Sequence, residues 1–91
     1  LEAMQQAAVE LGLSAEQGRH LAQATFLGAA ALASASDESL STLRERVTSK
    51  GGTTYAALTS MNDDAVQVAI IKALKAAAQR GAELGREFGQ N

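Results

Sequence analysis

The sequence predicts an all-α chain of about five helices. Three observations support this fold class: apolar residues recur every three or four positions, no stretch alternates apolar and polar residues as a strand would, and proline is absent. Alanine supplies much of the 46% hydrophobic content, and alanine favours helices but buries little area. A chain of 91 residues therefore makes one domain with a thin core, and we expect a second copy or a further domain to complete it.

The first two helices are indicated by spacing and by a cap. The first carries apolar residues at helical spacing and ends at Gly12; these residues are Leu1, Met4, Ala8 and Leu11. The run Ser14–Gln17 matches a capping box, so a second helix is expected from there to about Ala35. Small residues line its faces and let another helix approach closely, which places this helix in a helix–helix interface; they include Gly18, Ala22, Thr25, Gly28 and Ala29.

Three further helices are predicted in the second half of the chain. Ser36 or Asp37 is expected to cap a third helix whose apolar stripe is Leu40, Leu43 and Val47. A short fourth helix is expected to begin at Thr53 or Thr54 and to stop near Met61. Asn62 is then the predicted cap of the last helix, with Asp63 and Asp64 favouring the dipole in its first turn. The apolar stripe of that helix is Val66, Ile70, Ala73, Ala77, Leu84 and Phe88.

Composition excludes several classes of function. A net charge of −2 with both signs interspersed argues against nucleic acid or an anionic membrane as partner. Cysteine is absent and His20 is the single histidine, so we expect no metal site. No apolar run of about 18 residues and no signal peptide is visible, and a cytoplasmic protein is expected. The chain begins at Leu1 in mid-helical pattern without an initiator methionine, which indicates a fragment of a longer polypeptide.

One stretch, VTSKGGTTYAAL at residues 47–58, departs from the alanine-rich pattern. Its glycine pair allows unusual backbone angles and close approach of a ligand to main-chain amides. If the next helix begins at Thr53 or Thr54, its first N–H groups form a site for a carboxylate or phosphate. Ser49 and the threonines add hydroxyls, and Lys50 adds positive charge. A tight turn with one threonine as the N-cap explains the same residues equally well, so this reasoning alone leaves both interpretations open.

The run LRERVTSKGGTT, residues 43–54, closely resembles the signature of the pyrroline-5-carboxylate reductases. The surrounding runs also resemble that family in order and separation: GLS at 12–14, LAQATFLGAA at 21–30 and AAQRGAEL at 77–84. The chain is thereby identified as similar to the C-terminal dimerisation domain of these enzymes. That resemblance implies an interleaved helical dimerisation domain, of the kind that also forms the C-terminal part of 6-phosphogluconate dehydrogenase, over residues 1–91.

The resemblance also implies a function. The family reduces 1-pyrroline-5-carboxylate to L-proline with NADPH or NADH, which is bound mainly by an N-terminal Rossmann domain that this chain lacks. The chain alone is therefore expected to be inactive. Implied substrate-binding residues are Ser49, Gly51, Gly52, Thr53 and Thr54, and the Thr54 hydroxyl is implied to be catalytic by bonding the ring nitrogen. Position 50 is a lysine here, where many members have proline.

The implied partners are a second copy, with a higher oligomer of dimers left open, and a small-molecule substrate. Two other interpretations remain. The chain could be a non-catalytic helical interaction module whose Gly-Gly loop is only a turn, or a related reductase domain for another small imino or keto acid. A dinucleotide-binding unit upstream in the parent reading frame would exclude the interaction module.

Overall fold

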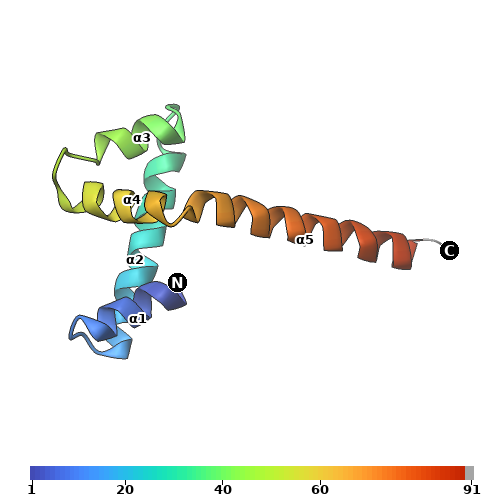
Figure 1. Cartoon of the computed structure of the whole chain (residues 1–91), viewed down its shortest axis with the longest axis horizontal. Helices are drawn as coiled ribbons and strands as arrows, with labels where there is room; N and C mark the ends of the chain where they lie inside the picture. Colours follow the sequence, from blue (N-terminus) through green and yellow to red (C-terminus); the bar gives the residue numbers. More distant parts are fainter. Residues whose placement is uncertain (90–91) are drawn as a thin grey trace. The chain divides into compact units, whose positions relative to one another are not determined.

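The computed structural model describes residues 1–89, and every regular element in that range is an α-helix. The five helices are α1 (Glu2–Glu10), α2 (Ala15–Ser34), α3 (Leu40–Arg46), α4 (Thr53–Asp63) and α5 (Val66–Gly89) (Figure 1). The predicted fold class and number of helices are confirmed. The chain divides into two compact units, Leu1–Arg46 and the part from Val47 onward. Whether they behave as one domain, as the sequence predicts, stays a prediction.

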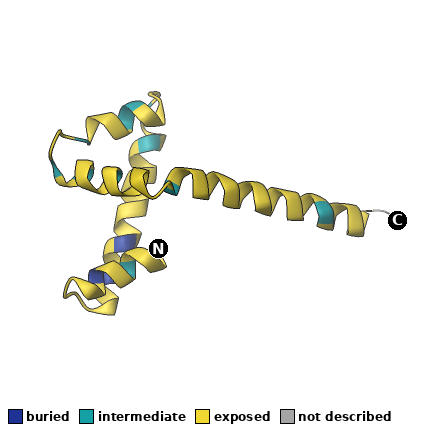
Figure 2. Cartoon of the chain, in the orientation of Figure 1, coloured by how far each residue is buried: buried dark blue, intermediate teal, exposed yellow. Residues whose placement is uncertain are grey.

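The first unit is held together by close contact between α1 and α2. A Cβ atom added at Gly18 would lie 3.0 Å from Ala8 Cβ and 3.1 Å from the Gln5 carbonyl oxygen, so a larger residue there would push the two helices apart by a few tenths of an ångström. Ala8, Gly18 and Ala22 are the buried residues of the two helices (Figure 2). The small residues of α2 therefore first admit α1 of the same chain, a role that the sequence pattern did not distinguish from contact with a partner.

The predicted capping box at the start of α2 is confirmed. The Gln17 backbone N–H donates to Ser14 Oγ at 3.1 Å, and the Ser14 N–H donates to Gln17 Oε1 at 2.9 Å. Both bonds satisfy amides that a helix start otherwise leaves without a partner. Gln5 Nε2 also donates to the Ala15 carbonyl at 2.9 Å, which ties α1 to this helix start.

The predicted cap of α3 is wrong. This helix begins at Leu40, and its first turn is capped by Ser39, whose Oγ accepts the Thr42 N–H at 3.2 Å. Ser36 instead accepts the Glu38 N–H at 3.1 Å, two residues further along. Because the Ser36 side chain bonds to a backbone N–H only two residues along, it forms a local turn and does not cap a helix. The helix therefore begins two or three residues later than predicted. Val47, predicted in the stripe, lies just beyond the helix.

The boundary between α4 and α5 also differs from the prediction. Asn62 and Asp63 belong to α4 and Asp64 is its C-cap, so none of them caps α5 or lies in its first turn. The helix is interrupted at Ala65, whose φ is 53° and whose N–H donates to the Asn62 carbonyl at 3.1 Å. Asp63 and Asp64 therefore lie between the negative end of the α4 dipole, which disfavours their charge, and the positive end of the α5 dipole, which favours it.

Helix α5 begins three residues later than predicted, and its apolar residues have no partner among the described residues. Its 24 residues extend over about 36 Å at 1.5 Å per residue, and the described residues bury none of its side chains (Figure 2). Exposed apolar side chains on α5 are Val68, Ile70, Ile71, Leu74, Leu84 and Phe88. Apolar area left uncovered in this way favours association with another surface. None of the described helices combines the length and the apolar character needed to cross a membrane.

Candidate functional site

A tight turn precedes α4, within the second unit. The Gly52 N–H donates to the Ser49 carbonyl at 2.9 Å, so Lys50 and Gly51 are the two central residues. Gly51 has a φ of 77°, whereas Lys50 is not among the described residues with a positive φ. A turn with a positive φ at its third position only is a type II turn, which favours glycine at that position and proline at the one before.

The second glycine of the pair has a different role. Gly52 has a φ of −87° and a ψ of −178°, which is extended backbone that any residue adopts. A Cβ atom there would collide with Ser49 Oγ and would lie 3.2 Å from the Ser49 carbonyl oxygen. The unusual backbone angle predicted for the glycine pair therefore applies to Gly51, while the absence of a side chain at Gly52 lets the Ser49 hydroxyl lie against it.

Helix α4 begins at Thr53 without a side-chain cap. Its N-cap is Gly52, and the first helical bond runs from the Ala56 N–H to the Gly52 carbonyl at 3.0 Å. The threonine N-cap of the simpler interpretation is therefore wrong. The N–H groups of Thr53, Thr54 and Tyr55 precede that first bond and point out of the positive end of the helix. Together they form a set of donors suited to an anion such as a carboxylate.

The structure brings the predicted site residues together in this one segment. Gly52 and Thr54 are half-buried, whereas Ser49, Gly51 and Thr53 are exposed. Lys50 is exposed and supplies the only charge between residues 49 and 54. A hollow of about 510 Å³ lies along α4, lined by Tyr55, Ala56, Thr59, Ser60, Asp63 and Asp64. Because this hollow contains none of the predicted residues, we assign it no role.

Among the described residues 1–89, neither a cluster of metal ligands nor a dinucleotide-binding unit is found. His20 lies exposed on α2, in the first unit, and no three histidine, aspartate or glutamate side chains in residues 1–89 are placed to hold a metal ion. The same residues contain no strand, and the glycine-rich turn before α4 follows a helix. A nicotinamide dinucleotide is bound by a strand–turn–helix unit, so this chain does not itself provide that site.

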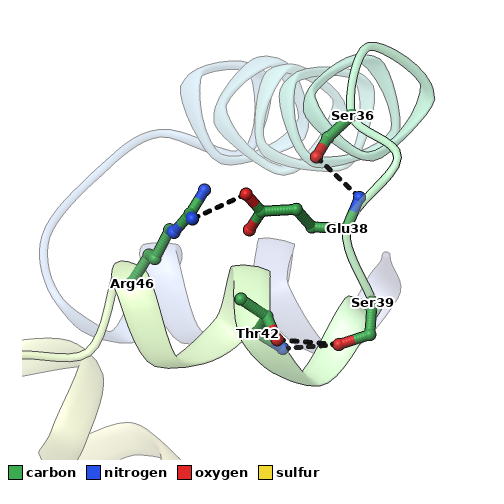
Figure 3. Close-up of polar contacts among 5 residues, drawn as sticks. All are labelled: Ser36, Glu38, Ser39, Thr42 and Arg46. Atoms are coloured by element: carbon green, nitrogen blue, oxygen red, sulfur yellow. Dashed lines mark hydrogen bonds and ion pairs between the residues drawn. The ribbon is translucent and has the colours of Figure 1, made fainter.

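One interaction near the loop was missed from the sequence. Arg46 is the last residue of α3. Its Nη2 atom lies 2.6 Å from Glu38 Oε1 in an ion pair (Figure 3). No periodicity reveals this contact, because the two residues are eight positions apart across the start of α3 and meet only once the turn at Ser36 has formed.

An all-α fold with apolar helix faces that the described residues leave uncovered defines the chain as a helical association domain. Residues 1–84 match the family model described as pyrroline-5-carboxylate reductase dimerisation, and the chain belongs to that family. Self-association is accordingly a property of this domain.

Relatives that are named pyrroline-5-carboxylate reductase match nearly the whole chain and support this assignment. Pyrroline-5-carboxylate reductase of Pseudomonas aeruginosa is 43% identical over 90 residues, which are 99% of this chain and 33% of the relative. The corresponding protein of Vibrio alginolyticus is 44% identical over 89 residues, 97% of this chain and 33% of the relative. Pyrroline-5-carboxylate reductase 2 of Bacillus subtilis is 36% identical over 88 residues, 97% of this chain and 32% of the relative. The chain thus spans about a third of the length of these relatives.

Proposed function

We propose that this chain is the dimerisation and substrate-binding domain of a pyrroline-5-carboxylate reductase. In that enzyme a hydride from NADPH or NADH reduces the C=N bond of 1-pyrroline-5-carboxylate, and L-proline is the product. The proposal rests above all on one observation: the segment that carries the family signature forms a glycine turn leading into an uncapped helix start. A cytoplasmic location is part of the same proposal.

The substrate carboxylate is proposed to bind at the start of α4. Because the Gly52 N–H already donates to Ser49, the donors are the amides of Thr53, Thr54 and Tyr55. Gly51 gives the turn its shape, and Gly52 lets an anion approach closely because it has no side chain. Lys50 adds one positive charge beside the bound carboxylate. Hydrogen bonds from main-chain amides to a carboxylate are charge-assisted and so among the stronger ones.

Two hydroxyls are proposed to orient the reacting part of the substrate. Thr54 donates a hydrogen bond to the ring nitrogen, and the Ser49 hydroxyl lies beside the substrate, where it packs against Gly52. Reduction places a hydride on the imine carbon and a proton on the nitrogen, so positioning of the imine matters more than a strong protein base. The remaining walls of the pocket and the dinucleotide site belong to the two thirds of the enzyme that this chain does not span.

The proposed assembly is a homodimer, with further association of dimers left open. The apolar side chains of α5 are its main support, because nothing in the described part of their own unit covers them. On α2, Leu21, Phe26, Leu27 and Leu32 are also exposed beyond the contact with α1.

The test of the proposed site is Thr54→Ala in a full-length reductase carrying this chain. Loss of one orienting hydrogen bond costs about 1–3 kcal/mol, so kcat/KM falls by about 5- to 150-fold. Thr54→Ser keeps the hydroxyl and is expected to retain most activity. Gly52→Val is expected to be worse than Thr54→Ala, because its branched side chain both displaces Ser49 and covers the amides. A Thr54→Ala enzyme with unchanged kcat and KM would show that the loop is only a turn.

A further inference from the structure

Lys50 occupies a position in the turn before α4 that local stability does not favour. It is the second residue of the type II turn closed by the Gly52–Ser49 bond, and that place favours proline. It also precedes the N-cap Gly52 by two residues, so its positive charge lies near the positive end of the α4 dipole. On both grounds a neutral residue would make the loop more stable in the absence of a ligand.

No carboxylate in the described part of its own unit offsets the charge of Lys50. The side chain is exposed and forms no ion pair with the residues that the structure describes. The first acidic residues after it, Asp63 and Asp64, lie at the far end of α4, about 15 Å along the helix at 1.5 Å per residue. That distance exceeds the screening length of about 8–10 Å at moderate salt. The glutamates of α5 pair with Arg80 instead.

An anion at the start of α4 would supply the charge that the chain does not. A residue that departs from local rules without compensation in its surroundings is typical of a functional site. The amides of Thr53, Thr54 and Tyr55 precede the first helical bond and can donate to such an anion. The lysine side chain is long and flexible, so its ammonium group can approach an anion held there while the turn keeps its shape.

We propose that Lys50 is a specificity-determining residue, which selects imines that carry a carboxylate over uncharged ones. The main-chain amides can donate to neutral acceptors as well, whereas a full positive charge favours only an anion. The identity of the ligand rests on the proposed function, and the selection of an anion does not. Because Lys50 is exposed, its effect is modest and is reduced by salt.

The kinetic test uses Lys50→Gln in a full-length reductase carrying this chain. The variant is expected to raise KM for 1-pyrroline-5-carboxylate about two- to fivefold at low salt, and high salt is expected to remove the difference. We expect little change in kcat, because the charge attracts the carboxylate equally in the ground and transition states. Lys50→Arg keeps the charge and is expected to restore most of the affinity. Lys72→Gln is the matched control, because it removes an exposed lysine without an ion pair from α5, and its KM is expected to match wild type.

Two probes of the same ring size supply a readout that does not depend on turnover. Cyclopentanecarboxylate carries the charge and cyclopentanecarboxamide does not, and an NMR titration of the same full-length protein gives a Kd for each. Lys50→Gln is expected to raise the Kd of the carboxylate about two- to fivefold at low salt and to leave that of the carboxamide unchanged. In urea unfolding without either probe, Lys50→Gln is expected to be at least as stable as wild type, because it removes a cation from the positive end of α4.

The possible outcomes separate this proposal from the proposed function. Equal rises in Kd for both probes would show that Lys50 acts through the shape of the loop and would overturn the proposal. Unchanged KM and Kd in Lys50→Gln at low salt, or no carboxylate binding by wild type, would overturn it as well. If carboxylate binding weakens as expected but the wild-type enzyme does not reduce the imine, the selection of an anion stands and the proposed function fails.

Discussion

The two glycines of the turn before α4 are needed for different reasons, and alanine at each position separates them. At Gly51 the φ of 77° is left-handed, which costs an L residue about 1–2 kcal/mol. Alanine offsets part of this cost by lowering the entropy of the unfolded chain, by about 0.4–1 kcal/mol. No described atom lies within 4 Å of the Cβ position, so sterics add nothing. We expect Gly51→Ala to lower the free energy of unfolding by about 1 kcal/mol.

At Gly52 the backbone suits alanine, and the cost comes from Ser49. The new methyl group would collide with Ser49 Oγ, which has to rotate to another staggered position at a cost of about 0.5 kcal/mol. With Ser49→Ala already in place, the nearest remaining side-chain atom is Cβ of residue 49 at 3.6 Å, an ordinary contact. The carbonyl oxygen at 3.2 Å is common to both backgrounds. The cost of Gly52→Ala is therefore expected to fall by about 0.5 kcal/mol once the hydroxyl is gone.

Urea unfolding measures this double-mutant cycle, with the protomer concentration held constant because association contributes to stability. Gly51→Ala is the matched control, and its cost is expected to be the same with and without Ser49→Ala. Equal costs of Gly52→Ala in both backgrounds would refute the steric explanation. A neutral Gly51→Ala would refute the assignment of the left-handed turn residue.

Three further predictions concern other parts of the chain. Lys50→Pro is expected to stabilise the protein by about 0.4–1 kcal/mol in urea unfolding, because proline suits the second position of the turn, and destabilisation would contradict the type II assignment. Ala65→Gly is expected to raise the free energy of unfolding by about 0.5–1 kcal/mol by relieving a left-handed alanine with a φ of 53°; no gain would show that Ala65 is not strained. Gly28→Leu is expected to lower the dimer fraction, because a side chain at this position has open space within its own chain and would clash only with a partner; an unchanged sedimentation profile would place Gly28 outside the interface.

Most of the fold follows from local rules that act within a few residues. The Ser14 cap and the extent of α2 were predictable because the signals lie next to the element that they define. The errors occurred where several candidate caps stand in a row. Ser36, Asp37 and Ser39 all suit a helix start, and which one caps depends on the turn that Ser36 makes with Glu38. In the same way Asn62 is a good cap by type, yet α4 continues through it.

The candidate site was predictable as a segment but not in its internal geometry. The glycine pair and the family signature indicate the loop at residues 49–54. Only the structure shows that Gly51 has the positive φ and that Gly52 makes room for Ser49. The use of the Gly52 amide within the turn was also not predictable, and it moves the proposed donors one residue along the chain. The Glu38–Arg46 pair lay beyond sequence reasoning, because it depends on the path of the chain around α3.

The uncovered face of α5 has a consequence for how assemblies of this domain exchange their subunits. Ile70 is 56% exposed, Leu74 67% and Phe88 75%, so a separated protomer would have to keep a long amphipathic helix folded in water with little tertiary support. We expect α5 to form part of the interface, so that dissociation is coupled to melting of this helix. Exchange of subunits between mature assemblies is then expected to be slow, and each newly made chain is expected to remain with the partner beside which its last helix first folds.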